Sequence, residues 1–251
     1  MGDILVKFFG DYHMHTTYSD GRGTVEEMVV AAAQSGLAEM GIADHGPANI
    51  GTGVKNEKVF IQIKEELRAL QSNNPGIRTY IGVESNILNT KGDLDVSREI
   101  IEQLDYLLVG LHPYIRPRRI NEAGWIINNQ AVWLFPPLKS KVINNNTKAL
   151  TEAIYKYDVR AITHPGLKMP IDIPEVAKAC LKCDTAWEIN AGHRFPDYHE
   201  VIEAARCGVD FIVNSDAHFP KTVGRLDYGG SVLEKAGIPS ERVKNAIDCE
   251  E

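Results

Sequence analysis

Short apolar runs alternate with longer amphipathic stretches along this 251-residue chain, and this alternation restricts the possible folds more than any other feature. Runs of period two are typical of strands, and apolar residues three and four positions apart are typical of helices. The first expected strand ends near residues 11–15. The other six cover residues 37–43, 78–83, 106–110, 159–163, 185–189 and 210–213. The expected helices cover residues 25–35, 57–71, 96–103, 142–157, 174–183, 198–207 and 241–247. Seven strands that alternate with helices predict an α/β fold with a parallel sheet or barrel.

The first expected helix has clear start and stop signals. Thr24 and Glu27 have the spacing of a capping box, in which each side chain accepts a hydrogen bond from the other residue's backbone N–H. Gly36 can adopt the left-handed conformation that commonly ends a helix. The length of the chain fits one α/β barrel, so we expect a single domain over residues 1–251.

Residues 113–141 interrupt the alternation, because they lack both helical and strand periodicity. They contain three arginines and two tryptophans, namely Arg116, Arg118, Arg119, Trp125 and Trp133. A long irregular insertion in a compact domain is usually functional or disordered, and the tryptophans favour order. We therefore expect a loop or hairpin over one mouth of the fold. Its arginines could steer an anionic substrate, although a run of charges is more often a solvated face.

Composition excludes several classes of protein. The hydrophobic and charged fractions, 43% and 24%, are those of an ordinary globular protein rather than a disordered chain. The net charge of −7 argues against long nucleic acid as the main partner, but a small anionic substrate remains compatible with it. No apolar run approaches the roughly 20 residues of a membrane helix, and residues 1–10 lack a signal peptide. Four cysteines, Cys180, Cys183, Cys207 and Cys249, are expected to be reduced thiols in a cytoplasmic protein. The sequence indicates no oligomeric state.

Histidines and acids follow six of the seven expected strands. Their positions are His13, His15, Asp20, His45, Glu84, His112, His164, Asp216 and His218. His13 and His15 point the same way on an extended chain, as do Asp216 and His218, because strand side chains alternate with period two. Each residue alone is a weak signal, but parallel strands bring their carboxyl ends together. The sequence therefore predicts a metal centre of nitrogen and carboxylate ligands that suits zinc, manganese or iron.

Strand six differs from the others, because it ends in Glu188 and Asn190 without a predicted metal ligand and is followed by His193 and Arg194. Arg194 could bind a phosphate bidentately or form a surface salt bridge. His193, or a metal-bound water, could supply the proton that a leaving alkoxide needs. Asp44, next to His45, could orient a ligand from behind.

These residues, in this order, resemble the four motifs of the polymerase-and-histidinol-phosphatase (PHP) family. The resemblance extends from about residue 10 to residue 225 and implies a distorted (βα)7 TIM-like barrel with a trinuclear metal centre at its C-terminal rim. It implies one ion held by His13, His15, Glu84 and Asp216. Glu84 would bridge to a second ion held by His112 and His164. A third ion would be held by Asp20, His45 and His218. Some family members have histidine at the position of Asp20, which leaves the identity of the third ion open.

The expected function is that of a metal-dependent phosphatase acting on a small phosphorylated metabolite, with histidinol phosphate as the guess from the family. Two or three divalent ions would generate a hydroxide near neutral pH, which attacks phosphorus in line. We expect Glu84, Asp216, His193 and Arg194 to take part in catalysis. A phosphodiesterase or 3′-5′ exonuclease is the alternative, since similar domains accompany DNA polymerases. A non-catalytic module would be favoured by missing ligands, but none is missing. An amidohydrolase would share the His-x-His pair but not the full order of motifs.

Overall fold

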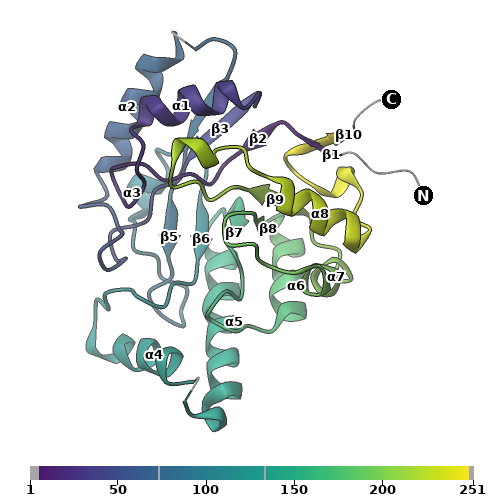
Figure 1. Ribbon diagram of the computed structural model, residues 1–251. Helices are drawn as coiled ribbons and strands as arrows, with labels where there is room; N and C mark the ends of the chain where they lie inside the picture. The colour runs from purple at the N-terminus through teal and green to yellow at the C-terminus, as the bar shows by residue number, and fades with distance from the viewer. Residues whose placement is uncertain (1–5, 73, 133, 249–251) are drawn as a thin grey trace.

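The computed structural model describes residues 6–72, 74–132 and 134–248, and most of its strands form two parallel sheets (Figure 1). The first sheet has the order β2 (Gly10–Asp11), β3 (Glu39–Ile42) and β4 (Arg78–Ile81). The second has the order β5 (Glu84–Asn86), β6 (Leu108–Gly110), β7 (Ala161–Ile162), β8 (Ala186–Asn190) and β9 (Phe211–Asn214). All neighbours in these two sheets run parallel. The predicted α/β fold with parallel strands is therefore confirmed.

Two isolated parallel bridges connect the edges of these sheets. One joins Met14, which follows β2, to Ala217, which follows β9. The other joins His45, which follows β3, to Glu84 at the start of β5. The bridges therefore bring together chain segments that carry several of the predicted ligands.

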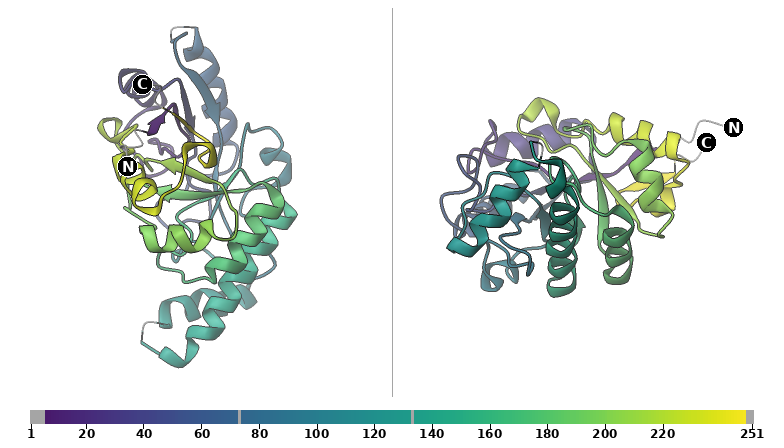
Figure 2. Two further views of the ribbon diagram at one scale, coloured as in Figure 1. Left: turned by 90° about the vertical axis from the view of Figure 1, so that its right-hand side faces the viewer. Right: turned by 90° about the horizontal axis from the view of Figure 1, so that it is seen from below.

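Helices connect most of the parallel strands and lie outside them, as Figure 2 shows. The α-helices are α1 (Val25–Gln34), α2 (Val59–Gln71), α3 (Arg98–Ile101), α4 (Ile120–Ala131), α5 (Lys139–Lys156), α6 (Ile173–Cys183), α7 (Tyr198–Ala205) and α8 (Asp227–Ala236). Short 3-10 helices are η1 (Pro136–Leu138), η2 (Pro220–Thr222) and η3 (Ser240–Arg242). The capping box of α1 is confirmed, because Thr24 Oγ1 accepts from Glu27 N at 3.2 Å and Glu27 Oε2 accepts from Thr24 N at 2.8 Å. Gly36 follows the end of α1 with φ +78°.

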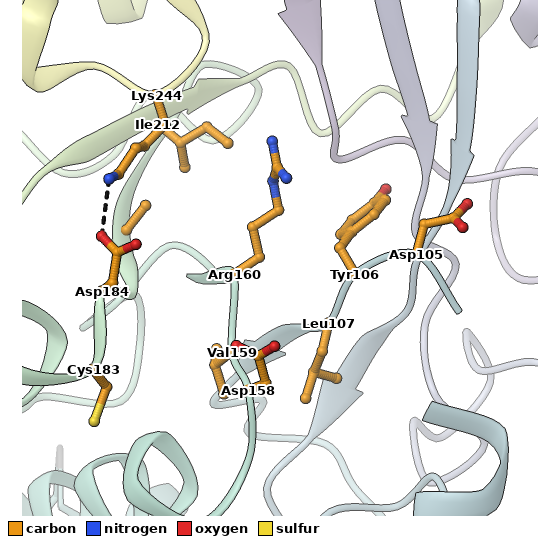
Figure 3. Close-up of a pocket in the computed structure, with 11 residues that line it drawn as sticks. Asp105, Tyr106, Leu107, Asp158, Val159, Arg160, Cys183, Asp184, Ile212 and Lys244 are labelled. Atoms are coloured by element: carbon orange, nitrogen blue, oxygen red, sulfur yellow. Dashed lines mark hydrogen bonds and ion pairs between the residues drawn. The ribbon is translucent and has the colours of Figure 1, made fainter. Parts of the chain in front are cut away.

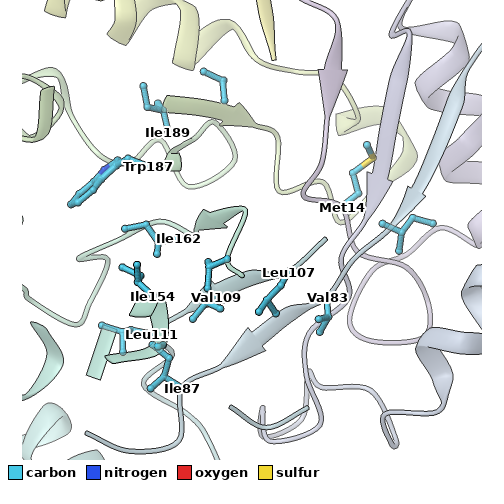
Figure 4. Close-up of a cluster of buried hydrophobic side chains, with 14 of the residues drawn as sticks. Met14, Val83, Ile87, Leu107, Val109, Leu111, Ile154, Ile162, Trp187 and Ile189 are labelled. Atoms are coloured by element: carbon cyan, nitrogen blue, oxygen red, sulfur yellow. The ribbon is translucent and has the colours of Figure 1, made fainter. Parts of the chain in front are cut away.

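Side chains on the parallel strands alternate between two hydrophobic clusters. Leu107, Val109, Ile162, Trp187 and Ile189 belong to the larger cluster, which Figure 4 shows. A smaller cluster contains Tyr106, Leu108, Ala161, Ala186 and Ile212, which alternate along the chain with residues of the larger cluster, together with Tyr12 and Ala43. The strands are therefore buried on both faces, as is usual for parallel sheets flanked by helices. Each fully buried large side chain stabilises such a core by roughly 1.5–3 kcal/mol.

The expected helix over residues 241–247 is wrong. After η3 the chain forms β10 (Ala246–Asp248), which pairs antiparallel with β1 (Val6–Phe8). Periodicity inside a short window cannot reveal a partner strand at the other end of the chain. Helix α8 is a further difference, since no element was expected there.

The expected irregular loop or hairpin over residues 113–141 is also wrong, because α4, η1 and the first residues of α5 occupy most of it. The segment begins beside residues 48–50, where Ile50 N donates to Tyr114 O at 3.0 Å. In α4, Trp125 is buried and its Nε1 donates to Asn146 Oδ1 of α5 at 2.9 Å. Asn146 also exchanges hydrogen bonds with Asn129, so a buried polar network fixes α4 on α5. Trp133 lies outside the described residues.

Within the described ranges, no helix is both long and apolar enough to cross a membrane. Cys180, Cys183 and Cys207 are unpaired, as expected for reduced thiols, and Cys249 lies outside the described part of the chain.

Candidate metal centre

The nine predicted ligands converge at the carboxyl ends of the parallel strands. Glu84 is the exception in position, because it is the first residue of β5, which follows β4 after a short break. His13 and His15 follow β2, His45 follows β3, Glu84 opens β5, His112 follows β6, His164 follows β7, and Asp216 and His218 follow β9. Asp20 lies in the turn between β2 and α1. The cluster thus draws on segments more than 200 residues apart, which only the strand order brings together.

Glu84 lies at the centre of the cluster and is fully buried. Its Oε1 lies 3.2 Å from His112 Nε2 and 3.0 Å from His164 Nε2. Its Oε2 lies 3.4 Å from His13 Nε2 and 2.6 Å from His45 Nδ1. His15 Nε2 lies 3.9 Å from the same Oε2. One carboxylate therefore faces five histidines from four strand ends, which is the placement that a ligand shared between two ions requires.

Asp216 faces a second group of histidines. Its Oδ1 lies 3.0 Å from His15 Nε2, 3.7 Å from His13 Nε2 and 3.5 Å from His218 Nδ1. Its Oδ2 lies 3.3 Å from His193 Nε2. Asp216 therefore links the buried part of the cluster to the half-exposed His193.

Asp20 forms the outer part of the cluster and is more exposed than Glu84. Its Oδ1 lies 3.3 Å from His218 Nε2, 3.8 Å from His45 Nε2 and 4.0 Å from His15 Nδ1. The three residues that the family resemblance assigns to a third ion are thus close together.

Four sets of donor atoms in the described residues have the spacing that a metal ion needs, and three of the sets share residues with one another. These sets are His15, Asp20, His45 and His218; His13, His15 and Glu84; His45, Glu84 and His112; and His164, His193 and Asp216. The last set contains His193, for which the sequence predicts a role as proton donor rather than ligand. Its signal in the sequence was its place directly after the strand that lacked a predicted ligand.

Unpaired buried atoms test whether a metal fits here. Fifteen buried side-chain nitrogen and oxygen atoms of the described residues make no hydrogen bond, and ten of them belong to His13, His15, His45, Glu84, His112, His164 and Asp216. An unpaired buried polar group costs about 1–3 kcal/mol. Their concentration in one place therefore indicates a missing common partner, and nitrogen and carboxylate donors suit a divalent cation.

Burial and neighbouring charges set the protonation of this cluster in the metal-free protein. Burial would raise the pKa of Glu84, but His112 and His13 outweigh it and hold that pKa well below its usual value. Burial lowers the pKa of His15 to about 3. Burial would also lower the pKa of His218, but the hydrogen bond to Asp20 and the charge of Asp216 raise it to about 9. Glu84 and His15 thus already have the charge state of metal ligands, whereas His13 and His218, whose pKa values are raised, must each lose a proton.

Glu188 of β8 was not predicted as a site residue, although it lies directly behind the cluster and is fully buried. His13 Nδ1 donates to Glu188 Oε1 at 2.7 Å, and the backbone N–H of His164 donates to Glu188 Oε2 at 2.7 Å. Asn190 and Asn214 donate to the remaining acceptor positions at 3.1 and 2.9 Å. Burial would lower the pKa of His13, but the charges of Glu188, Asp216 and Glu84 hold that pKa well above its usual value. Glu188 holds the Nδ1 proton, so His13 would bind a metal through Nε2 after losing the Nε2 proton, the arrangement by which carboxylates orient metal-binding histidines.

Asp44 orients the turn that carries Asp20. It accepts hydrogen bonds from Thr16 N at 2.7 Å and Thr16 Oγ1 at 2.6 Å, and one from Ser19 Oγ. Asp44 was expected to orient His45. Its hydrogen bonds instead go to Thr16 and Ser19, so it fixes the turn near Asp20 rather than the ring of His45.

A pocket of about 290 Å³ opens onto the cluster. Besides seven cluster residues it is lined by Asn49, Ile50, Thr52, Leu111, Pro113, Tyr114, Leu167 and Lys168. Among the described residues that line it, Lys168 is the single lysine or arginine. Ile50 and Tyr114 are 56% and 63% exposed and form an apolar rim.

The predicted arginines do not line this pocket. The guanidinium of Arg194 lies 5.0 Å from the ring centroid of Tyr228, and Arg118 donates to the backbone oxygen of Asp95 at 2.8 Å. A phosphate-binding role for Arg194 therefore stays a prediction.

A larger cavity, of about 340 Å³, lies at the opposite, amino-terminal ends of β6, β7 and β8 (Figure 3). Figure 3 shows Arg160 extending between Tyr106 and Ile212, and Lys244 paired with Asp184 at 2.9 Å. No set of possible metal ligands in the described residues lies at this cavity. The smaller pocket, where the unpaired donor atoms gather, is therefore the candidate active site.

The parallel strands and the cluster at their ends define the class: an α/β protein with a candidate metal centre of histidines and carboxylates. The PHP domain model matches residues 11–218, so the chain belongs to the PHP domain family. The family resemblance expected from the motifs is thus confirmed, and the matched region contains all nine predicted ligands.

The relatives of the chain include proteins named as probable phosphatases and one DNA polymerase. A probable phosphatase of Acetivibrio thermocellus is 29% identical over 250 residues, which cover 96% of this chain and 92% of that protein. A DNA polymerase/3′-5′ exonuclease of Bacillus subtilis is 27% identical over 247 residues, 94% of this chain but 39% of that protein. Among solved structures, a histidinol phosphate phosphatase of Lactococcus lactis, in complex with zinc, L-histidinol and phosphate, has a TM-score of 0.63 at 18% identity. That match covers 91% of this chain and 93% of that one, and it supports the fold.

Proposed function

We propose that this protein is a metal-dependent phosphatase that hydrolyses a phosphomonoester of a small metabolite. The observation that carries the proposal is the convergence of ten unpaired buried donor atoms, from seven of the nine predicted ligands, beside one pocket. The full-length similarity to a probable phosphatase supports the same reaction class.

The proposal includes a distorted seven-stranded barrel and a single domain over residues 1–251. Two features support the barrel: the strands are buried on both faces, and the Met14–Ala217 bridge joins the outer edges of the two sheets. The larger hydrophobic cluster extends from Met14 to Val243, which supports one domain.

The proposed centre holds two or three divalent ions, zinc, manganese or iron. One ion would be held by His13, His15, Glu84 and Asp216. A second would be held by Glu84, His112 and His164, and a third by Asp20, His45 and His218. Such ions, when bound, activate water for hydrolysis and neutralise charge on a phosphoryl group.

The chain's own residues would bind the substrate and manage the proton. Lys168 would attract the phosphate, and the rim that includes Ile50 and Tyr114 would contact the alcohol part of the ester. His193 lines the pocket 3.3 Å from Asp216, so it is our candidate for the group that protonates the leaving oxygen; burial lowers its pKa, and the charge of Asp216 opposes that shift. Arg194 would have to move away from Tyr228 to bind phosphate.

The test is a substrate screen of the full chain loaded with manganese or zinc. We expect phosphate release from monoesters to exceed cleavage of a phosphodiester and of single-stranded oligonucleotides at the same pH and metal concentration. Histidinol phosphate is the first monoester to test, because the Lactococcus lactis structure contains L-histidinol and phosphate. Efficient digestion of oligonucleotides with no action on any monoester would contradict the proposal.

A phosphodiesterase or 3′-5′ exonuclease is the second candidate. It is favoured by the similarity of 94% of this chain to part of a DNA polymerase/3′-5′ exonuclease. The net charge of −7 argues against it, because an acidic protein binds polyanions weakly. The same screen distinguishes the two candidates.

A further inference from the structure

Three arginines line one groove of about 220 Å³ that shares no lining residue with the pocket at the metal centre. Arg98 is the first residue of α3, and Arg118 and Arg119 directly precede α4. Tyr157 and the segment from Leu88 to Ser97 form other parts of the wall. We call this feature the arginine groove.

The charges of these three arginines are not neutralised by carboxylates. In the described part of the chain, none of the three guanidinium groups has a carboxylate oxygen within 4.0 Å. The arginines that do form ion pairs there are Arg78, with Glu39, and Arg242, with Asp210.

Both acids of the groove are already occupied. Asp93 pairs with Lys156. Glu122 is buried, and its Oε2 accepts from the backbone N–H groups of Arg118 and Arg119 at 2.8 and 2.9 Å. Its Oε1 accepts from Asn89 Nδ2 at 2.9 Å. The acids therefore shape the groove but do not pair with its guanidinium groups.

Two of the three guanidinium groups are held in place by backbone oxygens. Arg98 Nη2 donates to Lys156 O at 2.9 Å, and the Arg98 guanidinium lies 4.9 Å from the ring centroid of Tyr157. Arg118 Nη2 donates to Asp95 O at 2.8 Å. A guanidinium has five N–H donors, so most donors of both groups remain free. Groups fixed in this way lose little freedom when a ligand binds.

We propose that the arginine groove is a second binding site, for a small oxyanion with two or more negative charges, such as inorganic phosphate. Planar guanidinium groups bind such oxygens in pairs of parallel hydrogen bonds. The groove is smaller than the roughly 300–1,000 Å³ of ordinary metabolite pockets, which favours a compact anion. The site lies outside the metal centre, so it does not depend on the proposed phosphatase activity.

The test compares phosphate binding by the metal-loaded wild type and two double variants. Arg98→Gln/Arg119→Gln removes two charges from the groove, and Arg68→Gln/Arg206→Gln removes two charges from exposed positions elsewhere. Arg118 is left unchanged because its partner Asp95 also binds Ala48 N and Asn86 N, close to His45 and Glu84. All three proteins keep the metal centre, so a difference in phosphate bound per chain reports on the groove.

In equilibrium dialysis with radiolabelled phosphate, we expect the wild type and the Arg68/Arg206 control to bind one more phosphate per chain than the groove variant. The groove's affinity should fall at least about tenfold in that variant, since charge-assisted hydrogen bonds are lost. Sulfate should compete for the site, and chloride at equal ionic strength should not.

Equal phosphate binding in all three proteins would overturn the proposal. So would an equal loss in both double variants, which would indicate a general charge effect, or competition by chloride as effective as that by sulfate. Thermal unfolding is measured alongside. If the double variant does not fold, the single variant Arg119→Gln provides the same test, with the same expected loss of one phosphate per chain.

Discussion

At the scale of single residues, Glu84 and Asp20 occupy different depths of the cluster. Glu84 is fully buried and faces five histidines, whereas the side chain of Asp20 is 23% exposed. Glu84→Gln removes a charge that two ions would share, and Asp20→Asn affects one outer ion. We therefore expect Glu84→Gln to lower kcat at least about tenfold more than Asp20→Asn. Steady-state kinetics with elemental analysis of both variants checks this, and equal losses at equal metal content would contradict the assignment of Glu84 as the shared ligand.

Glu188 permits a prediction about a residue that is not itself a predicted ligand but forms hydrogen bonds with two of them, His13 and His164. Glu188→Gln weakens the hydrogen bond to His13 and the bond to the His164 backbone, so metal affinity or activity should fall about 10- to 100-fold. Glu39→Gln is the matched control, since Glu39 is also a buried strand glutamate but bonds to Tyr12 and Arg78. Activity is measured while metal is titrated into each variant, and Glu188→Gln should need more metal or reach a lower activity than Glu39→Gln. Equal metal affinity and equal activity in the two variants would mean that Glu188 has no orienting role.

The sequence allowed the convergence of the nine candidate ligands to be predicted, because each lies at or near the end of an expected strand. Glu188 could not be predicted in this way, because its partner His13 is 175 positions away and reaches it only through strand pairing. Its one signal was an acid between the apolar residues Trp187 and Ile189 of a buried strand. Arg194 was expected near the site, but no local pattern indicates its contact with Tyr228.

At the scale of elements, the sequence predicted those whose signals are local. Helix α1 has its capping box and final glycine within the element itself. Helix α8 was missed because it contains Gly229 and Gly230, which are poor helix formers. A Cβ on Gly229 would overlap Val213 of β9, so close packing on the sheet accounts for this glycine. Strand β10 was missed because its partner, β1, lies at the other end of the chain.

The loop after β7 permits a prediction about substrate binding. Its residues His164 and Lys168 have positive φ angles, +29° and +58°, which are costly for residues with a Cβ and are common at functional sites. Lys168→Gln should raise KM for a phosphomonoester about tenfold, because a charged hydrogen bond is lost, with a smaller effect on kcat. Lys178→Gln on the exposed face of α6 is the control and should behave as wild type.

Arg194→Ala should raise KM less than Lys168→Gln, and the opposite order would identify Arg194 as the main phosphate-binding residue.

At the scale of the whole molecule, the strand order places several buried carboxylates around one point. Glu84, Glu188 and Asp216 come from β5, β8 and the segment after β9, and all three are buried. The histidines whose pKa these carboxylates raise compensate part of this charge, but the unpaired donor atoms remain; these histidines are His13, His45, His164 and His218. Metal binding should therefore be linked to the stability of the entire fold and not only to activity, because the unfolded chain cannot assemble this cluster.

Removal of metal should accordingly lower the thermal midpoint of unfolding. An ion that binds the folded state alone stabilises it by about 2.7 kcal/mol at 100 times its Kd, which corresponds to about 5–10 °C for a chain of this length. Circular dichroism of protein treated with a chelator, and again after manganese or zinc is restored, measures this shift. Glu84→Gln should lose most of the shift, whereas Glu39→Gln should retain it, since Glu39 bonds to Tyr12 at the other end of the strands. Identical midpoints with and without metal in the wild type would show that the cluster does not hold an ion in the folded protein.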